Sequence, residues 1–250
     1  MTDWLAICRE AAGDVQAVLK DLPGRAEREP VVAHGEGGDD TTAIDAAAER
    51  VILKRFEGLD VTIVSEEVGE YGTGRWRVVV DPIDGSLNAK RGIPFFSLSI
   101  AVADGNTMRD VVFGYVYDFG SGEEWTATRG GGAFLNGERL GAQKPKDKIE
   151  ILSFESTLTS EVADKATAFR GIAHRLRIMG SLALSLCHLA AGRVDGVCSL
   201  KPSRSVDVAA GQLLLRECGL AIENVDGGAF AEAPLDLVAR SRIAAAVGGN

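Results

Sequence analysis

The stretch from Arg75 to Asn88 constrains the fold most. Its first part, Trp76 to Val80, is a short run of apolar and β-branched residues, which is typical of a buried strand. The run leads into Asp81-Pro82-Ile83-Asp84-Gly85-Ser86, in which two carboxylates stand three residues apart. Because Pro82 has no N–H for the sheet, we expect the strand to end there. The glycine allows a sharp bend, and Ser86 is expected to cap a helix that follows.

This turn has the composition of a site for a hard cation and an anion. The two carboxylates and a bare backbone carbonyl offer the oxygen ligands that Mg²⁺ prefers. The N–H groups of Gly85, Ser86 and Leu87, at a helix start, are placed to face an anion. A cation beside a phosphate is what the hydrolysis of a phosphate ester needs. An ordinary turn is the alternative that this stretch alone leaves open.

The overall composition limits the classes of function. A net charge of −9 argues against general nucleic-acid binding and is compatible with a cluster of carboxylates that gathers divalent metal. The four cysteines have no CxxC or zinc spacing, which predicts buried free thiols in a reducing cytoplasm. No run reaches the roughly 18 apolar residues of a membrane span, and no signal peptide is evident. We therefore expect a cytoplasmic protein with no membrane contact and no direct contact with nucleic acid.

The first third of the chain predicts two helices separated by a loop. Apolar residues recur on one helical face over residues 3–20. Residues 23–40 are polar and Gly-rich, which predicts a mobile loop. A second helix follows, with Ile44, Ala48 and Ile52 on its apolar face. Thr42 is expected to cap it, with Asp45 as the capping-box partner, so a purely structural role for Asp45 remains open.

The rest of the chain predicts layered α and β structure. A strand over 61–64 ends in Ser65-Glu66-Glu67, where solvated glutamates are the ordinary alternative to ligands. An antiparallel meander is expected from strands over 95–103, 111–118, 124–128 and 133–135. After a charged connector over 144–148, strands over 150–154, 174–178 and 195–199 alternate with helices over 160–169, 181–191 and 205–218. The connector divides the chain into an N-terminal half, 1–145, and a C-terminal half, 146–250, of one compact unit.

The motifs together resemble the inositol monophosphatase family, a superfamily of metal-dependent, lithium-sensitive phosphatases. They occur in family order over nearly the whole chain. The matching segments are Ser65-Glu66-Glu67, Asp81 to Ser86, Ala127 to Gly137, Gly180-Ser181, Ala190 to Gly196 and Val206 to Gly211. The resemblance implies an αβαβα sandwich with two mixed sheets, usually as a homodimer.

The resemblance also implies a role for each site residue. Glu66, Asp81 and the Ile83 carbonyl would hold the first Mg²⁺, and Asp81, Asp84 and Asp207 the second. Asp45 and the Ser86 hydroxyl would orient the attacking water, with a third, weaker metal near Glu66 and Asp45. Gly85, Ser86 and Leu87 would bind the phosphate through their N–H groups. Mn²⁺ is expected to substitute for Mg²⁺.

Within the family, two details favour one branch. Leu87 to Pro94 is similar to the dual-activity fructose-1,6-bisphosphatase/inositol-1-monophosphatase group, described chiefly in archaea. Val206 stands where most of the family has Trp before Asp207, which also fits that group. Leu200 stands where animal inositol monophosphatases carry a Glu that bonds inositol hydroxyls, which argues against narrow inositol specificity.

The substrate side is less defined by the sequence. Asp84, Gly180 and Ser181 are expected to face the substrate. Lys201 and Arg204, close in sequence to Asp207, are candidates for a second phosphate, as is Arg177, with a solvated loop position as the alternative.

The resulting hypothesis is a Mg²⁺-dependent phosphatase that acts on inositol 1-phosphate and fructose 1,6-bisphosphate. Three other esters remain open because the catalytic core does not encode the leaving group: 3′-phosphoadenosine 5′-phosphate, histidinol phosphate and NADP. A binding protein associated with transcription machinery is the alternative from another class.

Overall fold

Two large β-sheets form the framework of the protein. The computed structural model describes residues 2–36, 38, 40–156 and 158–247. In the described part, an eight-stranded sheet has the order β10-β9-β8-β7-β6-β5-β3-β4, and a five-stranded sheet has the order β12-β11-β13-β15-β14. A two-stranded hairpin, β1-β2, lies apart from both.

The N-terminal elements build the larger sheet and the helices outside it. Their bounds are α1 Trp4–Asp21, α2 Arg25–Arg28, β1 Val31–His34, β2 Asp40–Thr42, α3 Ala43–Lys54, β3 Val61–Ser65, β4 Gly69–Gly72, β5 Trp76–Asp84, α4 Ser86–Arg91, β6 Ser97–Ala103, η1 Met108–Asp110, β7 Val111–Asp118, β8 Glu124–Thr128, β9 Gly132–Leu135 and β10 Glu138–Arg139.

The C-terminal elements build the smaller sheet and the helices between the two sheets. Their bounds are β11 Ile149–Glu155, α5 Thr159–Lys165, η2 Ala166–Phe169, β12 Ala173–Arg177, α6 Leu182–Ala190, β13 Gly196–Ser203, α7 Ser205–Glu217, β14 Glu223–Asn224, η3 Phe230–Glu232 and β15 Ser241–Ala246.

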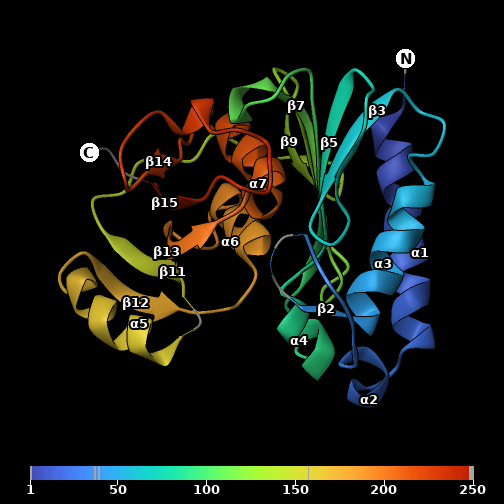
Figure 1. Ribbon diagram of the computed structural model, residues 1–250. Helices are drawn as coiled ribbons and strands as arrows, with labels where there is room; N and C mark the ends of the chain where they lie inside the picture. The colour runs from blue at the N-terminus through green and yellow to red at the C-terminus, as the bar shows by residue number, and fades with distance from the viewer. Residues whose placement is uncertain (1, 37, 39, 157, 248–250) are drawn as a thin grey trace.

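The layers alternate, and the predicted αβαβα sandwich is confirmed. α1 and α3 cover the outer face of the larger sheet, while α6 and α7 lie between the two sheets (Figure 1). α5 and η2 cover the far face of the smaller sheet, where Phe169 packs on Phe154 with ring centroids 4.9 Å apart. Both sheets contain parallel and antiparallel pairs, so both are mixed.

The side-chain alternation of β5 shows why its sheet is covered on both faces. Val78 and Val80 belong to the cluster beneath α1 and α3, whereas Val79 belongs to the cluster with α6 and α7. Successive side chains of a strand point to opposite faces, so a continuous apolar run needs cover on both. The predicted buried strand is confirmed.

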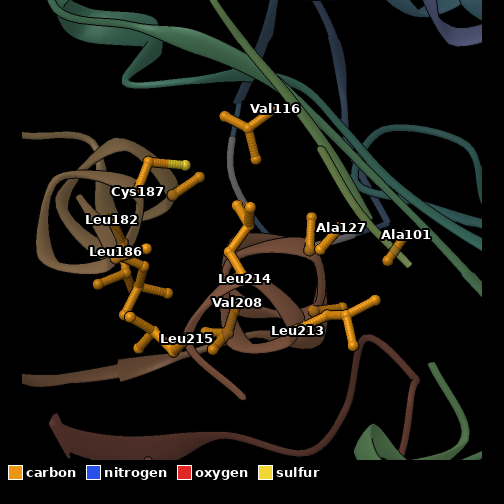
Figure 2. Close-up of a cluster of buried hydrophobic side chains, with 14 of the residues drawn as sticks. Ala101, Val116, Ala127, Leu182, Leu186, Cys187, Val208, Leu213, Leu214 and Leu215 are labelled. Carbon is orange, nitrogen blue, oxygen red and sulfur yellow. The ribbon is translucent and has the colours of Figure 1, made fainter. Parts of the chain in front are cut away.

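The central core lies between the larger sheet and the helix pair α6–α7. Figure 2 shows Leu213 and Leu214 of α7 pointing toward Val116, Ala127 and Ala101 of the sheet. Small residues allow a close approach, since a Cβ on Gly114 would lie 2.9 Å from the carbonyl oxygen of Ala210. This packing fixes α7, and with it the start of that helix, against the sheet.

The predicted helix starts and thiols are largely confirmed. The Thr42–Asp45 capping box is present at α3, and the Ser181 side chain accepts a hydrogen bond from the N–H of Leu184 at the start of α6. The four cysteines are free and buried. Within the described ranges, no helix combines the length and apolarity needed to cross a membrane.

Three local predictions are wrong. β5 does not end at Pro82 but continues to Asp84, with a shift of register between Asp81 and Asp84 that spares the missing N–H. The residue that caps α4 is Gly85, not Ser86, because the backbone is left-handed there (φ 89°). β13 likewise continues through Pro202 to Ser203 across an irregular pairing with β15.

The predicted loop over 23–40 is also partly wrong. It contains the short helix α2 and the hairpin β1–β2, in which every residue of β1 is exposed. Gly37 and Asp39 lie outside the described residues, so the predicted mobility of this loop stays a prediction.

Overpacking between α7 and the sheet is expected to destabilise the protein. Gly114→Ala places a methyl group against the backbone of Ala210, which cannot rotate away, and we expect a loss of about 1–3 kcal/mol in the free energy of unfolding. Thermal denaturation measures this. The control is Gly13→Ala, an exposed mid-helix position with open space around it, where we expect a gain of up to about 1 kcal/mol. Equal stability of the two variants would contradict this account of the core.

Candidate active site

The register between β3 and β5 brings the first two acidic groups together. The strands are parallel and pair Ser65 with Val80, so the next residues along each chain, Glu66 just after β3 and Asp81 still within β5, lie side by side at the carboxyl end of the pair. The carboxylate of Asp81 is buried and accepts a hydrogen bond of 3.0 Å from the N–H of Ile83. The register of the two strands therefore places two carboxylates at this end of the sheet, as the sequence predicts.

Asp84 is oriented by the other half of the chain. Its Oδ2 accepts hydrogen bonds from the Ser181 hydroxyl at 2.5 Å and from the N–H of Ala183 at 2.7 Å. Both donors stand at the start of α6, where N–H groups have no partner inside the helix. Gly85 follows in a left-handed conformation and lies close to the loop before α6, since a Cβ there would be 3.0 Å from the carbonyl oxygen of Gly180.

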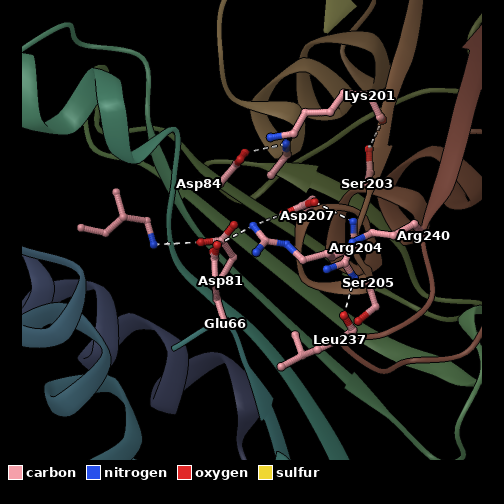
Figure 3. A network of polar contacts seen from close by, with 12 residues as sticks. Glu66, Asp81, Asp84, Lys201, Ser203, Arg204, Ser205, Asp207, Leu237 and Arg240 are labelled. Carbon is pink, nitrogen blue, oxygen red and sulfur yellow. Dashed lines mark hydrogen bonds and ion pairs between the residues drawn. The ribbon is translucent and has the colours of Figure 1, made fainter. Parts of the chain in front are cut away.

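Asp207 enters the same site from the first turn of α7. Its Oδ2 accepts a hydrogen bond of 2.7 Å from the N–H of Arg204. The guanidinium of Arg204 forms an ion pair with Glu66, and its Nη2 is 3.7 Å from Oδ1 of Asp207 (Figure 3). Figure 3 shows Glu66, Asp81 and Asp207 around this side chain, with Asp84 directed toward the start of α6. Arg204 thus acts as a counter-charge to carboxylates from both halves of the chain.

The electrostatics of this cluster are those of buried like charges. Burial raises the pKa of Glu66 to about 8, and the negative charges of Asp207 and Glu67 contribute to the rise. The positive charge of Arg204 opposes this rise but does not cancel it. Burial and the charge of Asp207 raise the pKa of Asp84 to about 7, against the opposing hydrogen bonds from α6. Burial and the charges of Glu66, Asp84 and Asp207 raise the pKa of Asp81 well above its usual range. A further cation would relieve this repulsion.

The donor set fits Mg²⁺, although the ligands are not fully assembled. The groups are carboxylate oxygens together with a backbone carbonyl, which suit a hard cation. Among the described residues, no three His, Cys, Asp or Glu side chains are arranged to hold a metal ion as they stand. Arg204 is the group placed between Glu66 and Asp207, and its guanidinium would have to move for both to ligate an ion.

Asp45 lies beside the cluster on the first turn of α3. It is buried, and its Oδ2 accepts hydrogen bonds from the N–H of Thr42 at 3.2 Å and from the Thr42 hydroxyl. Its structural role as a capping-box partner is therefore real, and it also lines the cavity that Glu66 and Asp81 line. The capping-box role predicted for Asp45 is confirmed, and its role toward the attacking water stays a prediction.

A cavity of about 300 Å³ joins these groups, which is within the range of small-molecule sites. It contains most of the predicted site residues. The lining includes Asp45, Glu66, Asp81, Ile83, Asp84, Gly85, Ser86, Leu87, Gly180, Lys201, Arg204 and Asp207.

Two predicted residues do not line that cavity. Ser181 is buried behind Asp84 and contacts it directly. Arg177 is exposed at the end of β12, where its Nη1 donates to the carbonyl of Leu176. The structure does not bring Arg177 to the other site residues.

Three residues of the site were missed at the sequence level. Glu49, buried on α3, accepts hydrogen bonds from the Ser65 hydroxyl and from the N–H groups of Glu67 and Val68, so it supports the turn that carries Glu66. Glu155 accepts from the N–H of Gly180. Lys90 places its ammonium near Asp45. For Glu49 the available signal is its position one turn after Asp45, beside the apolar face of the helix.

Comparisons with known proteins give matches over nearly the whole chain. The sequence profile of the Inositol monophosphatase family matches residues 3–249. A fructose-1,6-bisphosphatase/inositol-1-monophosphatase of Archaeoglobus fulgidus is 34% identical over 250 residues, which cover 98% of this chain and 93% of the relative. The Nus factor SuhB of Salmonella typhimurium is 38% identical over 232 residues, 87% of this chain and 82% of that protein.

A solved structure has the same fold. The crystal structure of an inositol monophosphatase–fructose 1,6-bisphosphatase gene product superposes with a TM-score of 0.87 at 29% identity, covering 99% of this chain and 96% of that one. The similarity in fold and the similarity in sequence thus indicate the same family.

The raised carboxyl pKa values give an expected pH dependence of stability. In metal-free protein, Glu66 and Asp84 bind their protons more tightly folded than unfolded, so their contribution is complete below the unfolded values near 4. That contribution is lost progressively as the pH rises from near 4 through about 7 for Asp84 and about 8 for Glu66. We expect the melting temperature in EDTA to fall between about pH 4 and about pH 8, and Glu66→Gln to flatten the decline. A wild-type slope in that variant would contradict the assignment.

Proposed function

The chain belongs to the inositol monophosphatase family, and we propose that it is a Mg²⁺-dependent phosphatase that acts on sugar and polyol phosphate monoesters. The substrates proposed are inositol 1-phosphate and fructose 1,6-bisphosphate, which the name of the Archaeoglobus relative suggests. The observation that carries the proposal is the convergence of Glu66, Asp81, Asp84 and Asp207 from both halves of the chain on one cavity.

The proposed ligands are those the resemblance implies. Glu66, Asp81 and the Ile83 carbonyl would hold one ion, and Asp81, Asp84 and Asp207 a second. Bound Mg²⁺ would neutralise phosphate oxygens, lower the pKa of the attacking water and stabilise the leaving alkoxide. The buried carboxylates and the hydrogen bonds that hold Asp84 and Asp207 support this role.

The remaining groups of the turn would position the reactants. Asp45 and the Ser86 hydroxyl would orient the water for attack on phosphorus. The N–H groups of Gly85, Ser86 and Leu87 would hold the phosphate, as donors fixed before the reaction begins. The left-handed backbone at Gly85 supports this, because it starts α4 directly at the cavity.

The substrate's second anionic group would meet Lys201 and Arg204. Lys201 is exposed and lines the cavity, so its ammonium can reach a ligand without breaking a described contact. Arg204 is bound to Glu66 and Asp207, and we propose that cation binding releases it toward the substrate. Gly180 also lines the cavity. Ser181 lies outside the lining and holds Asp84 in place through its hydroxyl.

Several finer properties remain part of the proposal. They are a homodimeric assembly, a cytoplasmic location, sensitivity to lithium, the presence of a third, weaker ion, and the use of Mn²⁺ in place of Mg²⁺. We also propose that residues 1–145 and 146–250 work as one catalytic unit, since α7 of the second half packs on the sheet of the first.

A binding role is the second candidate, and one finding favours it. The Salmonella relative is named a Nus factor, and its identity to this chain is 38%. Co-purification after mild lysis would test it: a stable complex with transcription proteins would support this role, and a protein that elutes without partners would count against it.

Removing one carboxylate is expected to slow turnover strongly. Asp84→Asn keeps the shape of the side chain but removes a charge from the cluster, and we expect kcat to fall by about 10³ or more. Phosphate release with saturating Mg²⁺ measures this. The control is Asp104→Asn, an exposed position paired with Arg75, which should retain wild-type turnover. Wild-type kcat in the Asp84 variant would refute the metal assignment.

Substrate preference is expected to depend on Arg204. Arg204→Ala should weaken kcat/KM for fructose 1,6-bisphosphate more than for inositol 1-phosphate, because only the former carries a second phosphate. Arg175→Ala, which removes a surface partner of Glu150, is the matched control. Equal losses on both substrates in the Arg204 variant would remove that residue from the second-phosphate role.

The proposed function is tested by phosphate release from a panel of esters. The panel holds inositol 1-phosphate, fructose 1,6-bisphosphate, 3′-phosphoadenosine 5′-phosphate, histidinol phosphate and NADP, each with Mg²⁺ and with EDTA. Comparable kcat/KM on the first two is the expected result. Activity confined to another ester would keep the catalytic residues and replace the substrate, and no metal-dependent activity would favour the binding role.

A further inference from the structure

Lys90 is a cation inside the cavity that the proposed mechanism does not use. It stands on α4 one turn after Ser86, so its side chain lies on the same face of the helix as the start of the turn. The side chain is only 15% exposed and lines the cavity. Its neighbour Arg91 lies on the outer side, 46% exposed and paired with Glu29 at 2.6 Å. The two adjacent basic residues therefore have different environments.

The helix that carries Lys90 is held rigidly. The guanidinium of Arg28 donates to the carbonyl of Ala89 at 2.7 Å and to the carbonyls of Leu22 and Leu19 at 2.6 and 3.0 Å. These bonds connect α4 to the end of α1. Lys90 is thus supported by a fixed backbone, with Ala89 buried beneath it.

The ammonium of Lys90 lies beside Asp45. Nζ is 3.6 Å from Oδ2, the same oxygen that accepts both hydrogen bonds from Thr42. All three described contacts of Asp45 fall on Oδ2, which leaves Oδ1 as the atom to accept from a water. The position of Asp45 is therefore set by Thr42 and its charge is balanced by Lys90.

Two of the three cations that line the cavity in the described part of the chain pair with different carboxylates. Arg204 pairs with Glu66 and Asp207, whereas Lys90 pairs with Asp45. The guanidinium contacts proposed metal ligands and must leave them when an ion binds. The ammonium contacts the carboxylate assigned to water and has no such reason to leave.

We propose that Lys90 is the resident cation of Asp45, and that its charge weakens the binding of the third divalent ion beside this carboxylate, so that Asp45 remains available to a water. An ion held by Oδ1 would lie close to the ammonium, and like charges at that separation repel strongly in a partly buried site. This inference rests on the proposed function and adds to it a reason why ions concentrate at the Asp81 side of the cavity.

The test is a titration of substrate-free protein with Mn²⁺, followed by calorimetry and by the electron paramagnetic resonance of free Mn²⁺. The variants are Lys90→Met, which removes the charge at similar length, and Lys90→Arg, which keeps it. Arg91→Met is the matched control, because it removes the adjacent charge at the surface. Circular dichroism verifies that each variant is folded.

We expect Lys90→Met to bind the weakest Mn²⁺ of the chain several-fold more tightly than wild type, while Lys90→Arg and Arg91→Met bind as wild type does. An equal affinity for that ion in wild type and Lys90→Met would overturn the role of Lys90 and leave the proposed function intact. A wild-type protein that binds no Mn²⁺ would overturn both.

Discussion

Parallel pairing between β3 and β5 positions the acidic groups from which the rest of the site is built. It sets Ser65 opposite Val80, so the strands deliver Glu66 and Asp81 to one edge of the sheet. The register shift at Pro82 then lets β5 continue to Asp84. α6 and α7, packed on the same sheet, bring the donors that hold Asp84 and the carboxylate of Asp207. If the pairing of β3 with β5 slipped by one residue, every side chain of the slipped strand would point to the opposite face of the sheet. The apolar cores on both faces therefore fix the register, and the register fixes the positions of the acidic groups.

The cost of this arrangement is electrostatic. Carboxylates that share a buried cavity raise one another's pKa, and the charge of Arg204 offsets only part of the rise at Glu66 and Asp81. Arg204 stands at the start of α7 and Lys90 in the last turn of α4, and both side chains line the cavity. Because these buried carboxylates repel one another in the metal-free protein, a divalent ion that binds them would stabilise the folded state.

Periodicity predicted the elements whose burial is regular. α1, α3 and α7, and the strands β7 and β8, lie where the apolar pattern indicates. The β1–β2 hairpin has no buried residue in β1 and hence no alternation to detect. β5 and β13 pass beyond prolines because irregular pairing removes the need for an N–H, a tertiary effect. In the sequence, Glu49 and Glu155 cannot be distinguished from solvated carboxylates, because the turns that they support form only in the folded chain. Asp207 was connected with the rest of the site only through the family resemblance.

The central claim is that one carboxylate cluster, drawn from both halves of the chain, binds the divalent ions. A crystal grown with Mn²⁺ tests it most directly, through the anomalous scattering of the ion. We expect a peak bounded by Glu66, Asp81, Asp84 and Asp207, with the Arg204 guanidinium displaced from Glu66. A cavity that shows no Mn²⁺ peak, with Arg204 still paired to Glu66 and Asp207, would contradict the account.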